Sequence, residues 1–187
     1  KYDTIGEDLV AMVVDDLVVC GAEPLFLTDY IAVGKVIPER IAEIVSGIAR
    51  GCEWSRTALI GGETAEHPQL LKADEFDLAA AATGVVEHEK LLGEHLVKAR
   101  DVAIAIESSG VHANGFSLVR HIIKTAKLSL EAHVSEYGKT SGEVFLTPTE
   151  IYTLDCLALI KSMPEHLHAF SHITGGGIAE NTARVIP

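Results

Sequence analysis

The first segment of the chain has an amphipathic pattern. Apolar residues recur there every three or four positions: Ile5, Leu9, Met12, Val13, Leu17 and Val18. This spacing predicts a helix with one apolar face. Thr4 and Glu7 have the spacing of a capping box, so we expect the helix to begin at Thr4. We expect it to end at Gly21, because glycine readily adopts the left-handed conformation that closes helices.

Three apolar runs in the first half predict strands. They cover residues 24–33, 57–60 and 75–86 and are rich in branched, aromatic or small side chains. Between the first two lies a second helical pattern, which Pro38 opens. Its apolar residues fall on one face: Ile41, Ile44, Val45 and Ile48. Helices and strands therefore alternate, which is typical of α/β and α+β proteins.

A polar stretch, residues 87–100, separates this half from the rest. We expect a domain boundary there, with a first domain over residues 1–88 and a second over residues 89–187. The second half predicts further elements: a buried strand at 102–106, a helix at 114–124 with its apolar face buried, a helix from Pro148 to about 162, a short strand at 168–174 and a helix at 178–185. The predicted fold class is α+β with α/β-like alternation, in two domains.

The acidic charge limits the classes of partner. The chain has 27 acidic and 15 basic residues, a formal net charge of −12. Binding to nucleic acid or to an anionic membrane is therefore not expected. No apolar run is long enough to span a membrane. Cys20, Cys52 and Cys156 lie far apart in the sequence, which indicates reduced thiols and a cytoplasmic protein.

The strand at 57–60 leads into Gly61-Gly62-Glu63-Thr64. A strand that ends in two glycines and then presents a carboxylate is a common way of holding metal or phosphate ligands on a rigid base. An ordinary turn with solvated acids explains the same residues equally well.

Other acids are candidate partners for Glu63. Asp15 and Asp16 lie late in the first helix, where the helix dipole disfavours negative charge. Adjacent helical residues point about 100° apart, so one of the two can face inward. That acid, with Glu63 and Asp29, is a candidate magnesium ligand. The alternative is a solvated acidic helix face.

A loop in the second half combines serine, histidine and asparagine. Ser109, His112, Asn114 and Ser117 lie between a predicted strand and a predicted helix, where free N–H groups suit an anion or a polar substrate. His112 can act as a general acid or base near neutral pH. The alternative is a helix cap by Asn114 with an exposed His112.

His172 precedes a glycine triplet, Gly175-Gly176-Gly177. A strand, a glycine triplet and a helix have the layout of a phosphate-binding loop. The sequence lacks the GK[ST] of a Walker A motif and the GxGxxG of a dinucleotide site. A tight turn relieved by glycine is the alternative.

Together these motifs resemble those of the phosphoribosylformylglycinamidine cyclo-ligases, or AIR synthetases. Matching segments cover nearly the whole chain in the order of that family: Asp3–Lys35, Leu59–Pro68, Ser108–Arg120, Leu146–Tyr152 and His172–Asn181. No single segment is specific to the family, but the ordered set is. Related families of small-molecule kinases and amidotransferases share the architecture without the whole set.

The resemblance implies an activity and a site. ATP would activate an amide oxygen of formylglycinamidine ribonucleotide, and an internal nitrogen would then close the imidazole ring, with release of ADP and phosphate. Metal ligands would be Asp16 and Glu63. Residues binding ATP with Mg²⁺ would be Asp16, Asp29, Gly61, Gly62, Glu63 and Thr64. Catalytic residues would be His112 and His172. Residues binding the substrate would be Ser109, Asn114, Ser117, Thr174, Gly175, Gly176 and Gly177.

The resemblance also implies a homodimer in which the sheets of the two first domains pair, in agreement with the small residues at 79–83. Some residues depart from the family pattern, at Cys20, directly after Glu66 and within His112–Ser117. The family has a further N-terminal segment and a longer second domain, so we expect this chain to be a fragment that does not turn over alone. The alternatives are a related kinase or amidotransferase-like enzyme, and a non-catalytic dimerising fragment.

Overall fold

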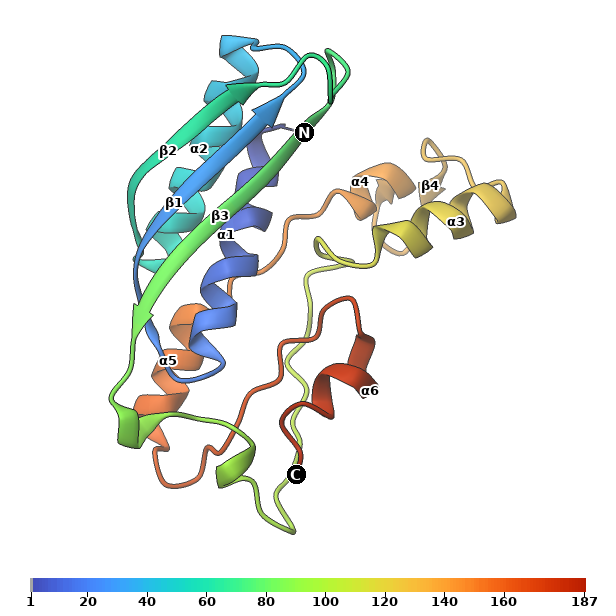
Figure 1. Cartoon of the computed structure of the whole chain (residues 1–187). Coiled ribbons are helices and arrows are strands. Elements are labelled where there is room, and N and C mark those ends of the chain that lie inside the picture. Colours follow the sequence, from blue (N-terminus) through green and yellow to red (C-terminus); the bar gives the residue numbers. More distant parts are fainter. Residues whose placement is uncertain (1) are drawn as a thin grey trace.

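The computed structural model describes residues 2–187, and its first half is a three-stranded sheet with two helices against one face (Figure 1). The elements follow one another as helix α1 (Tyr2–Val18), strand β1 (Glu23–Val33), helix α2 (Pro38–Ser55), strand β2 (Ala58–Glu66) and strand β3 (Phe76–Val85). β1 is the central strand, parallel to β2 and antiparallel to β3. The predicted alternation of helices and strands is confirmed.

The hydrophobic core lies between the sheet and the two helices. Apolar side chains from α1, β1 and α2 meet there and are almost fully buried: Val10, Val14, Leu27, Ile31, Val33, Ile44, Ile48 and Cys52. Burying one such aliphatic side chain contributes about 1.5–3 kcal/mol. The helices approach closely at Gly6, where a Cβ atom would lie 2.3 Å from the backbone nitrogen of Ile48. This packing makes α1 a rigid support for whatever its other face carries.

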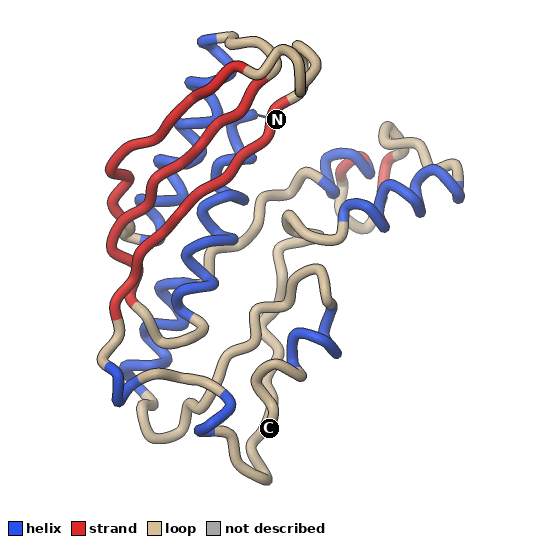
Figure 2. Tube along the Cα trace, viewed as in Figure 1, coloured by secondary structure: helices blue, strands red, loops and turns tan. Residues whose placement is uncertain are grey.

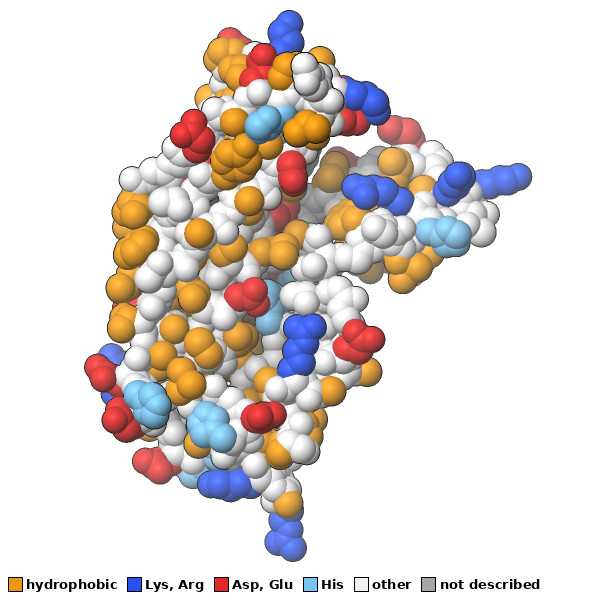
Figure 3. Space-filling model, in the orientation of Figure 1, with side chains coloured by type: hydrophobic (Ala, Val, Ile, Leu, Met, Phe, Trp, Pro, Cys, Tyr) orange, Lys and Arg blue, Asp and Glu red, His pale blue; other side chains and the backbone are white. Residues whose placement is uncertain are grey.

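The other face of the sheet is open. Residues of β3 alternate along the strand, with Phe76 and Leu78 packed against the core and Ala79 and Ala81 exposed. Tyr30 of β1, opposite Ala79, is 37% exposed. Figure 3 views this open face of the sheet and shows hydrophobic side chains spread over it.

Two local predictions in the first half are wrong. α1 already includes Tyr2, so Thr4 lies inside the helix and does not cap it. The glycines after Ile60 do not end a strand either, because β2 continues through them to Glu66. The pairing of β1 with β2 shifts register between Leu27 and Thr28, opposite Leu59 and Gly61. The glycines therefore accompany a β-bulge inside a continuous strand.

The second half is more open and contains long stretches without regular structure (Figure 2). Its elements are the short 3₁₀ helices η1 (His88–Lys90) and η2 (Glu94–Leu96), helix α3 (Phe116–Ala126), the small hairpin of β4 (His133–Val134) and β5 (Lys139–Thr140), helix α4 (Ser141–Phe145), helix α5 (Thr153–Ser162) and helix α6 (Gly177–Thr182). α5 packs against α1, whereas α3 and α4 project away from the sheet (Figure 1).

Several predictions for the second half are wrong. Residues 102–106 form no strand, and Val102 and Ile104 are 81% and 85% exposed. Residues 168–174 have no regular structure, and the helix predicted from Pro148 begins only at Thr153. α3 forms as predicted but has no buried residue. An apolar pattern predicts which face an element can bury, but a strand forms only where another strand pairs with it. Among residues 2–187, no helix is both long enough and apolar enough to cross a membrane.

Candidate active site

One face of α1 points away from the sheet toward the second half of the chain. The residues on it are spaced at helical intervals: Asp8, Met12, Asp15, Asp16 and Val19, the last just beyond the end of the helix. The opposite side of the helix carries Val10 and Val14 into the core. The same helix is therefore anchored by its apolar face and presents three carboxylates on the other.

Two of these carboxylates hold the chain that leads into α5. Asp8 accepts hydrogen bonds from the backbone nitrogen and the hydroxyl of Thr149, at 2.8 and 2.5 Å. Asp15 accepts from the Thr153 hydroxyl at 2.7 Å and from the Tyr152 backbone nitrogen at 3.2 Å. Asp15 is 4% exposed, and burial raises the pKa of its carboxyl group above the usual value. The inward acid of the pair is thus Asp15, and both its oxygens are used in packing α5 on α1.

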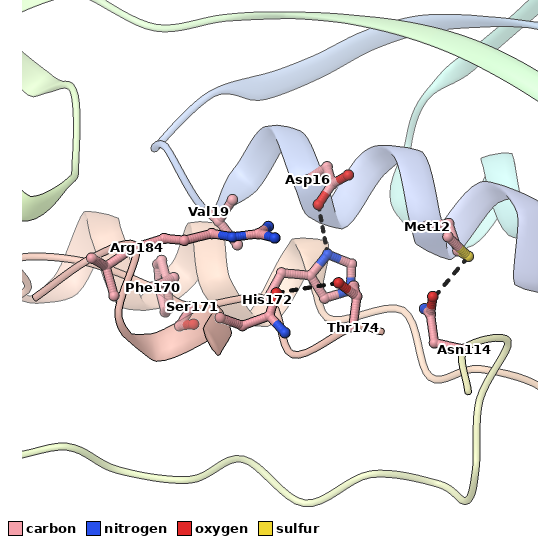
Figure 4. Close-up of a pocket in the computed structure, with 11 residues that line it drawn as sticks. Met12, Asp16, Val19, Asn114, Phe170, Ser171, His172, Thr174 and Arg184 are labelled. Carbon is pink, nitrogen blue, oxygen red and sulfur yellow. Dashed lines mark hydrogen bonds and ion pairs between the residues drawn. The ribbon is translucent and has the colours of Figure 1, made fainter. Parts of the chain in front are cut away.

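The third carboxylate, Asp16, contacts His172. Nδ1 of His172 lies 2.7 Å from Oδ1 of Asp16 (Figure 4). The Asp16 side chain is 67% exposed and the His172 side chain 21%. A carboxylate accepts hydrogen bonds, so the proton of the neutral imidazole sits on Nδ1 and the lone pair is on Nε2. Nε2 has no hydrogen-bond partner in the described part of the chain.

Asp16 and His172 line a cleft of about 290 Å³ between α1 and the segment that contains α6. The lining residues come from α1, from the loop before α3 and from the C-terminal segment: Met12, Asp16, Val19, Asn114, Phe170, Ser171, His172, Thr174, Asn181, Arg184 and Val185. Three predicted site residues beside Asp16 therefore meet in one place, namely Asn114, His172 and Thr174.

The irregular segment from His168 to His172 is fixed by hydrogen bonds at both ends. Nδ1 of His168 lies 2.7 Å from Oδ2 of Asp101, and the backbone nitrogen of Gly93 donates to the His168 carbonyl oxygen at 3.1 Å. Asp101 also accepts from the Lys98 backbone nitrogen, and these contacts lower the pKa of its carboxyl group. The loop is thus fixed at His168 and again at His172, which explains how an irregular segment can present a defined site.

His112 lies beside the cleft but does not line it. Its Nε2 accepts a hydrogen bond from the Ser109 backbone nitrogen at 3.2 Å, and its φ angle of 59° is left-handed. Burial lowers the pKa of the imidazole. The Ser109 hydroxyl donates to the Pro148 carbonyl oxygen and accepts from the Glu150 backbone nitrogen. These contacts give both residues a structural part in joining two loops.

The remaining residues predicted to bind substrate do not line the cleft. Ser117 is exposed in the first turn of α3. The glycine triplet makes the turn into α6, where the Gly177 backbone nitrogen donates to the Thr174 carbonyl oxygen. The Thr174 hydroxyl donates to Asn181 Oδ1, and Asn181 Nδ2 donates to the Gly177 carbonyl oxygen. Asn181 is 2% exposed and so fixes the shape of this turn.

The residues predicted to bind ATP lie elsewhere, on β1 and β2. Asp29 and Gly62 are opposite each other, and the Asp29 carboxylate fills the space where a Cβ of Gly62 would stand, 2.5 Å from both oxygens. Burial raises the pKa of Asp29. Glu63, opposite Tyr30, is exposed, as are Gly61 and Thr64. A second hollow of about 240 Å³ lies beside Asp29 on the neighbouring strands.

The structure does not bring Asp16 and Glu63 into one cluster. Glu63 does not line the cleft that contains Asp16. No group of three His, Cys, Asp or Glu side chains in residues 2–187 is placed to hold a metal ion. Magnesium that arrives with a nucleotide needs only one or two protein carboxylates besides the phosphates. Exposed Glu63 fits such a ligand, and the shared site of Asp16 and Glu63 stays a prediction.

The sequence motifs do not single out several residues that line the cleft, among them Phe170, Ser171, Asn181 and Arg184. Asn181 and Arg184 lie four and seven residues after Gly177, so helical spacing from the glycine triplet would place both on one face. They also do not predict the part played by Glu66. Oε2 of Glu66 accepts from the Val36 backbone nitrogen at 2.6 Å and so ties down the loop between β1 and α2.

Comparison with known families covers almost the whole chain. Residues 1–86 match the family model for the AIR synthase related protein, N-terminal domain, and residues 98–187 match that for its C-terminal domain. Curated phosphoribosylformylglycinamidine cyclo-ligases are similar over the full chain. The sequence is 51% identical to that of Pseudothermotoga lettingae and 52% identical to that of Lachnospira eligens, each over 100% of this chain. The chain spans 54% of the length of both relatives.

Solved structures share the fold at lower identity. E. coli HypE aligns over 94% of this chain and 49% of its own, with a TM-score of 0.62 and 18% identity. A thiamine-monophosphate kinase from Stenotrophomonas maltophilia aligns over 91% of this chain and 47% of its own, with a TM-score of 0.55 and 21% identity. These likenesses confirm the predicted mixed α+β fold, and the predicted pairing of sheets in a dimer stays a prediction.

Proposed function

The chain belongs to the AIR synthase-related family, and on that premise we propose that the protein containing it closes the imidazole ring of formylglycinamidine ribonucleotide with ATP. The products would be aminoimidazole ribonucleotide, ADP and phosphate. The observation that carries the proposal is the cleft in which Asp16 orients His172 beside Asn114 and Thr174. Because the chain spans about half of each relative, the activity is proposed for the complete protein that contains these residues.

The reaction needs an oxygen to become a leaving group. The formamide oxygen of the substrate would take the γ-phosphoryl group, and the P–O bond to ADP would break. The internal nitrogen would then attack the formamide carbon, the C–O bond would break, and phosphate would leave. The attacking nitrogen must also lose a proton. ATP supplies the phosphoryl group when bound, and this chain would supply orientation and a proton acceptor.

We assign the proton acceptor to His172. Asp16 holds its Nδ1–H, so Nε2 presents a lone pair to the cleft and can receive the proton of the attacking nitrogen. Asp16 also stabilises the imidazolium that forms, as a carboxylate behind a catalytic histidine does. Asn114 and Thr174 would orient the substrate, while the contacts of His112 with Ser109 indicate that His112 positions the loop.

The nucleotide would bind along β1 and β2, and because direct phosphoryl transfer needs its γ-phosphate beside the substrate oxygen, a second protomer would bring these strands to the cleft. Gly61 leaves the backbone there uncovered, since no atom lies within 4 Å of its Cβ position, and the exposed Glu63 is available as a magnesium ligand. We further propose a homodimer formed through the open face of the sheet, where Tyr30, Ala79 and Ala81 are accessible. All three cysteines are free thiols, which supports a cytoplasmic location.

The proposal is tested by following the oxygen atom. Substrate labelled with ¹⁸O at the formamide oxygen is incubated with ATP and the complete protein. We expect one ring-closed product and one ADP per turnover, with the label recovered in inorganic phosphate. Accumulation of a phosphorylated substrate without ring closure would instead show a small-molecule kinase. Absence of both products would contradict an ATP-dependent enzyme acting on this substrate.

A further inference from the structure

Three hydrogen-bond donors that line the cleft have no strong acceptor in residues 2–187. The guanidinium of Arg184 makes no hydrogen bond or ion pair with any residue between 2 and 187. The Ser171 hydroxyl is buried and likewise has no partner in that part of the chain. Nδ2 of Asn114 reaches only the sulfur of Met12, at 3.8 Å, and a thioether is a weak acceptor. Three donors from three separate positions thus lack a good acceptor.

The acceptors that line the cleft do not satisfy these donors. Oδ1 of Asp16 accepts from His172, and the side-chain oxygen of Asn181 accepts from Thr174, so neither oxygen is paired with Arg184, Ser171 or Asn114. Buried polar groups in folded proteins are nearly always hydrogen-bonded, and an unpaired one is costly. The unpaired Ser171 hydroxyl and the free guanidinium of Arg184, which belong to residues lining the same cleft, therefore indicate a bound group rich in acceptor oxygens.

We propose that Arg184 and Ser171 form the subsite for the 5′-phosphate of the ribonucleotide substrate. A phosphate monoester carries close to two negative charges near neutral pH and three strong acceptor oxygens. The planar fork of an arginine matches two of them. The chain has a net charge of −12, so an anion is repelled unless an unpaired cation lies in its path. Arg184 is the one Lys or Arg among the lining residues described above.

The proposed phosphate subsite and the Asp16–His172 pair occupy different parts of the cleft. In Figure 4 the Arg184 side chain extends beside Val19 toward the Asp16–His172 pair, and Asn114 lies on the far side of that pair. The cleft, about 290 Å³, is near the lower end of the range for ligand pockets. With its phosphate on the Arg184 side, the substrate would extend its reacting end to Nε2 of His172. The identity of the nucleotide rests on the proposed function, whereas binding of a phosphate monoester does not.

Binding of ribose 5-phosphate to the complete protein tests the subsite. By isothermal titration calorimetry, Arg184→Gln is expected to weaken binding by about 10- to 100-fold, the value of a charge-assisted hydrogen bond. Unphosphorylated ribose should bind the variant and the unaltered protein equally. Arg120→Gln is the matched control, because it removes the same charge from α3, where the guanidinium lies 5.9 Å from the ring centroid of Phe116, outside the cleft.

Equal affinity of ribose 5-phosphate for the unaltered protein and for Arg184→Gln would overturn the proposal, as would no measurable binding to the unaltered protein. A variant that loses ATP affinity but keeps ribose 5-phosphate affinity would also overturn it, since the subsite would then serve the triphosphate. Ser171→Ala should weaken ribose 5-phosphate as well. If ring closure is absent while Arg184→Gln still weakens ribose 5-phosphate, the subsite stands and only the proposed reaction fails.

Discussion

Two neighbouring aspartates, Asp15 and Asp16, have different surroundings and therefore different parts in the molecule. Asp15 is buried and holds the start of α5, whereas Asp16 is mostly exposed and orients His172. Helical geometry predicts that two adjacent residues face different ways. It does not predict which acid faces inward, because that depends on Thr153, which lies 138 positions further along the chain.

The burial of Asp15 predicts a pH dependence of stability. Burial raises the pKa of this carboxyl group above 3.8 in the native state, so the native state holds a proton at a pH where the unfolded state has lost it. The free energy of unfolding should therefore rise as the pH falls through the native pKa and level off below 3.8. Urea unfolding at a series of pH values should show this rise in the unaltered chain relative to Asp15→Asn.

Asp101 provides a comparison of opposite sign. Its hydrogen bonds from Lys98 and His168 lower the pKa of its carboxyl group, so its stabilisation is present above 3.8 and is lost as the pH falls through the lower native pKa. The stability difference between the unaltered chain and Asp101→Asn should thus stay constant above 3.8 and shrink in stronger acid. If the stability contributed by Asp101 also rose as the pH fell, as expected for Asp15, the opposite pKa shifts of the two carboxyl groups would be contradicted.

Gly62 is expected to tolerate no side chain. A Cβ atom there would lie 2.5 Å from both oxygens of Asp29, so Gly62→Ala forces the carboxylate aside. Overpacking of this kind costs about 1–3 kcal/mol, measurable by urea unfolding. The same substitution should cost less when Asp29 is already alanine. Gly175→Ala is the control, because no atom lies within 4 Å of its Cβ position, and its expected change is within about 0.5 kcal/mol.

At the scale of elements, the first half could be predicted from the sequence and much of the second could not. β1, α2 and β3 form close to where apolar periodicity places them, because each buries its apolar residues in one shared core. The run at 102–106 has the same kind of pattern but no pairing strand in the described chain, and it stays exposed. The glycines of β2 predict a turn, but the structure has a bulge there, and a bulge depends on the register with β1, which the local sequence does not show.

The sequence predicts only part of the site, because local motifs identify single residues and not the distant residues that the fold brings beside them. Asp16, Asn114, His172 and Thr174 were singled out from local motifs, and the fold brings them to one cleft. Arg184 belongs to no such motif, and only the three-dimensional arrangement shows that it lines the same cleft as His172. The distance in sequence between Asp16 and His172, 156 positions, is why their hydrogen bond could not be inferred from spacing.

At the scale of the whole molecule, the open face of the sheet is the surface proposed for dimerisation. It presents Tyr30 and the small residues Ala79 and Ala81, which allow close approach of a second sheet. Ala79→Arg would place a charge at the centre of that face, so analytical ultracentrifugation should show monomers where the unaltered complete protein is dimeric. Lys161→Glu on α5 is the control. A monomeric unaltered protein, or a dimer that survives Ala79→Arg, would contradict the proposed interface.

The cleft between α1 and the C-terminal segment is the centre of the proposed activity, and its parts come from distant regions of the chain. In the proposed mechanism His172 accepts the proton, and Asp16 acts only by orienting His172. A residue that acts only through another loses its effect once that other residue is removed. This property separates an orienting carboxylate from an independent magnesium ligand.

The most direct test is a double-mutant cycle on kcat/KM for ring closure in the complete protein. His172→Ala should lower kcat/KM by about 10²- to 10⁴-fold, Asp16→Ala should lower it by less, and the double variant should be no slower than His172→Ala. His166→Ala, which changes an exposed histidine outside the cleft, should leave it unchanged. If instead the two effects multiply, or if His172→Ala turns over at the unaltered rate, Asp16 and His172 do not form the catalytic pair of this cleft.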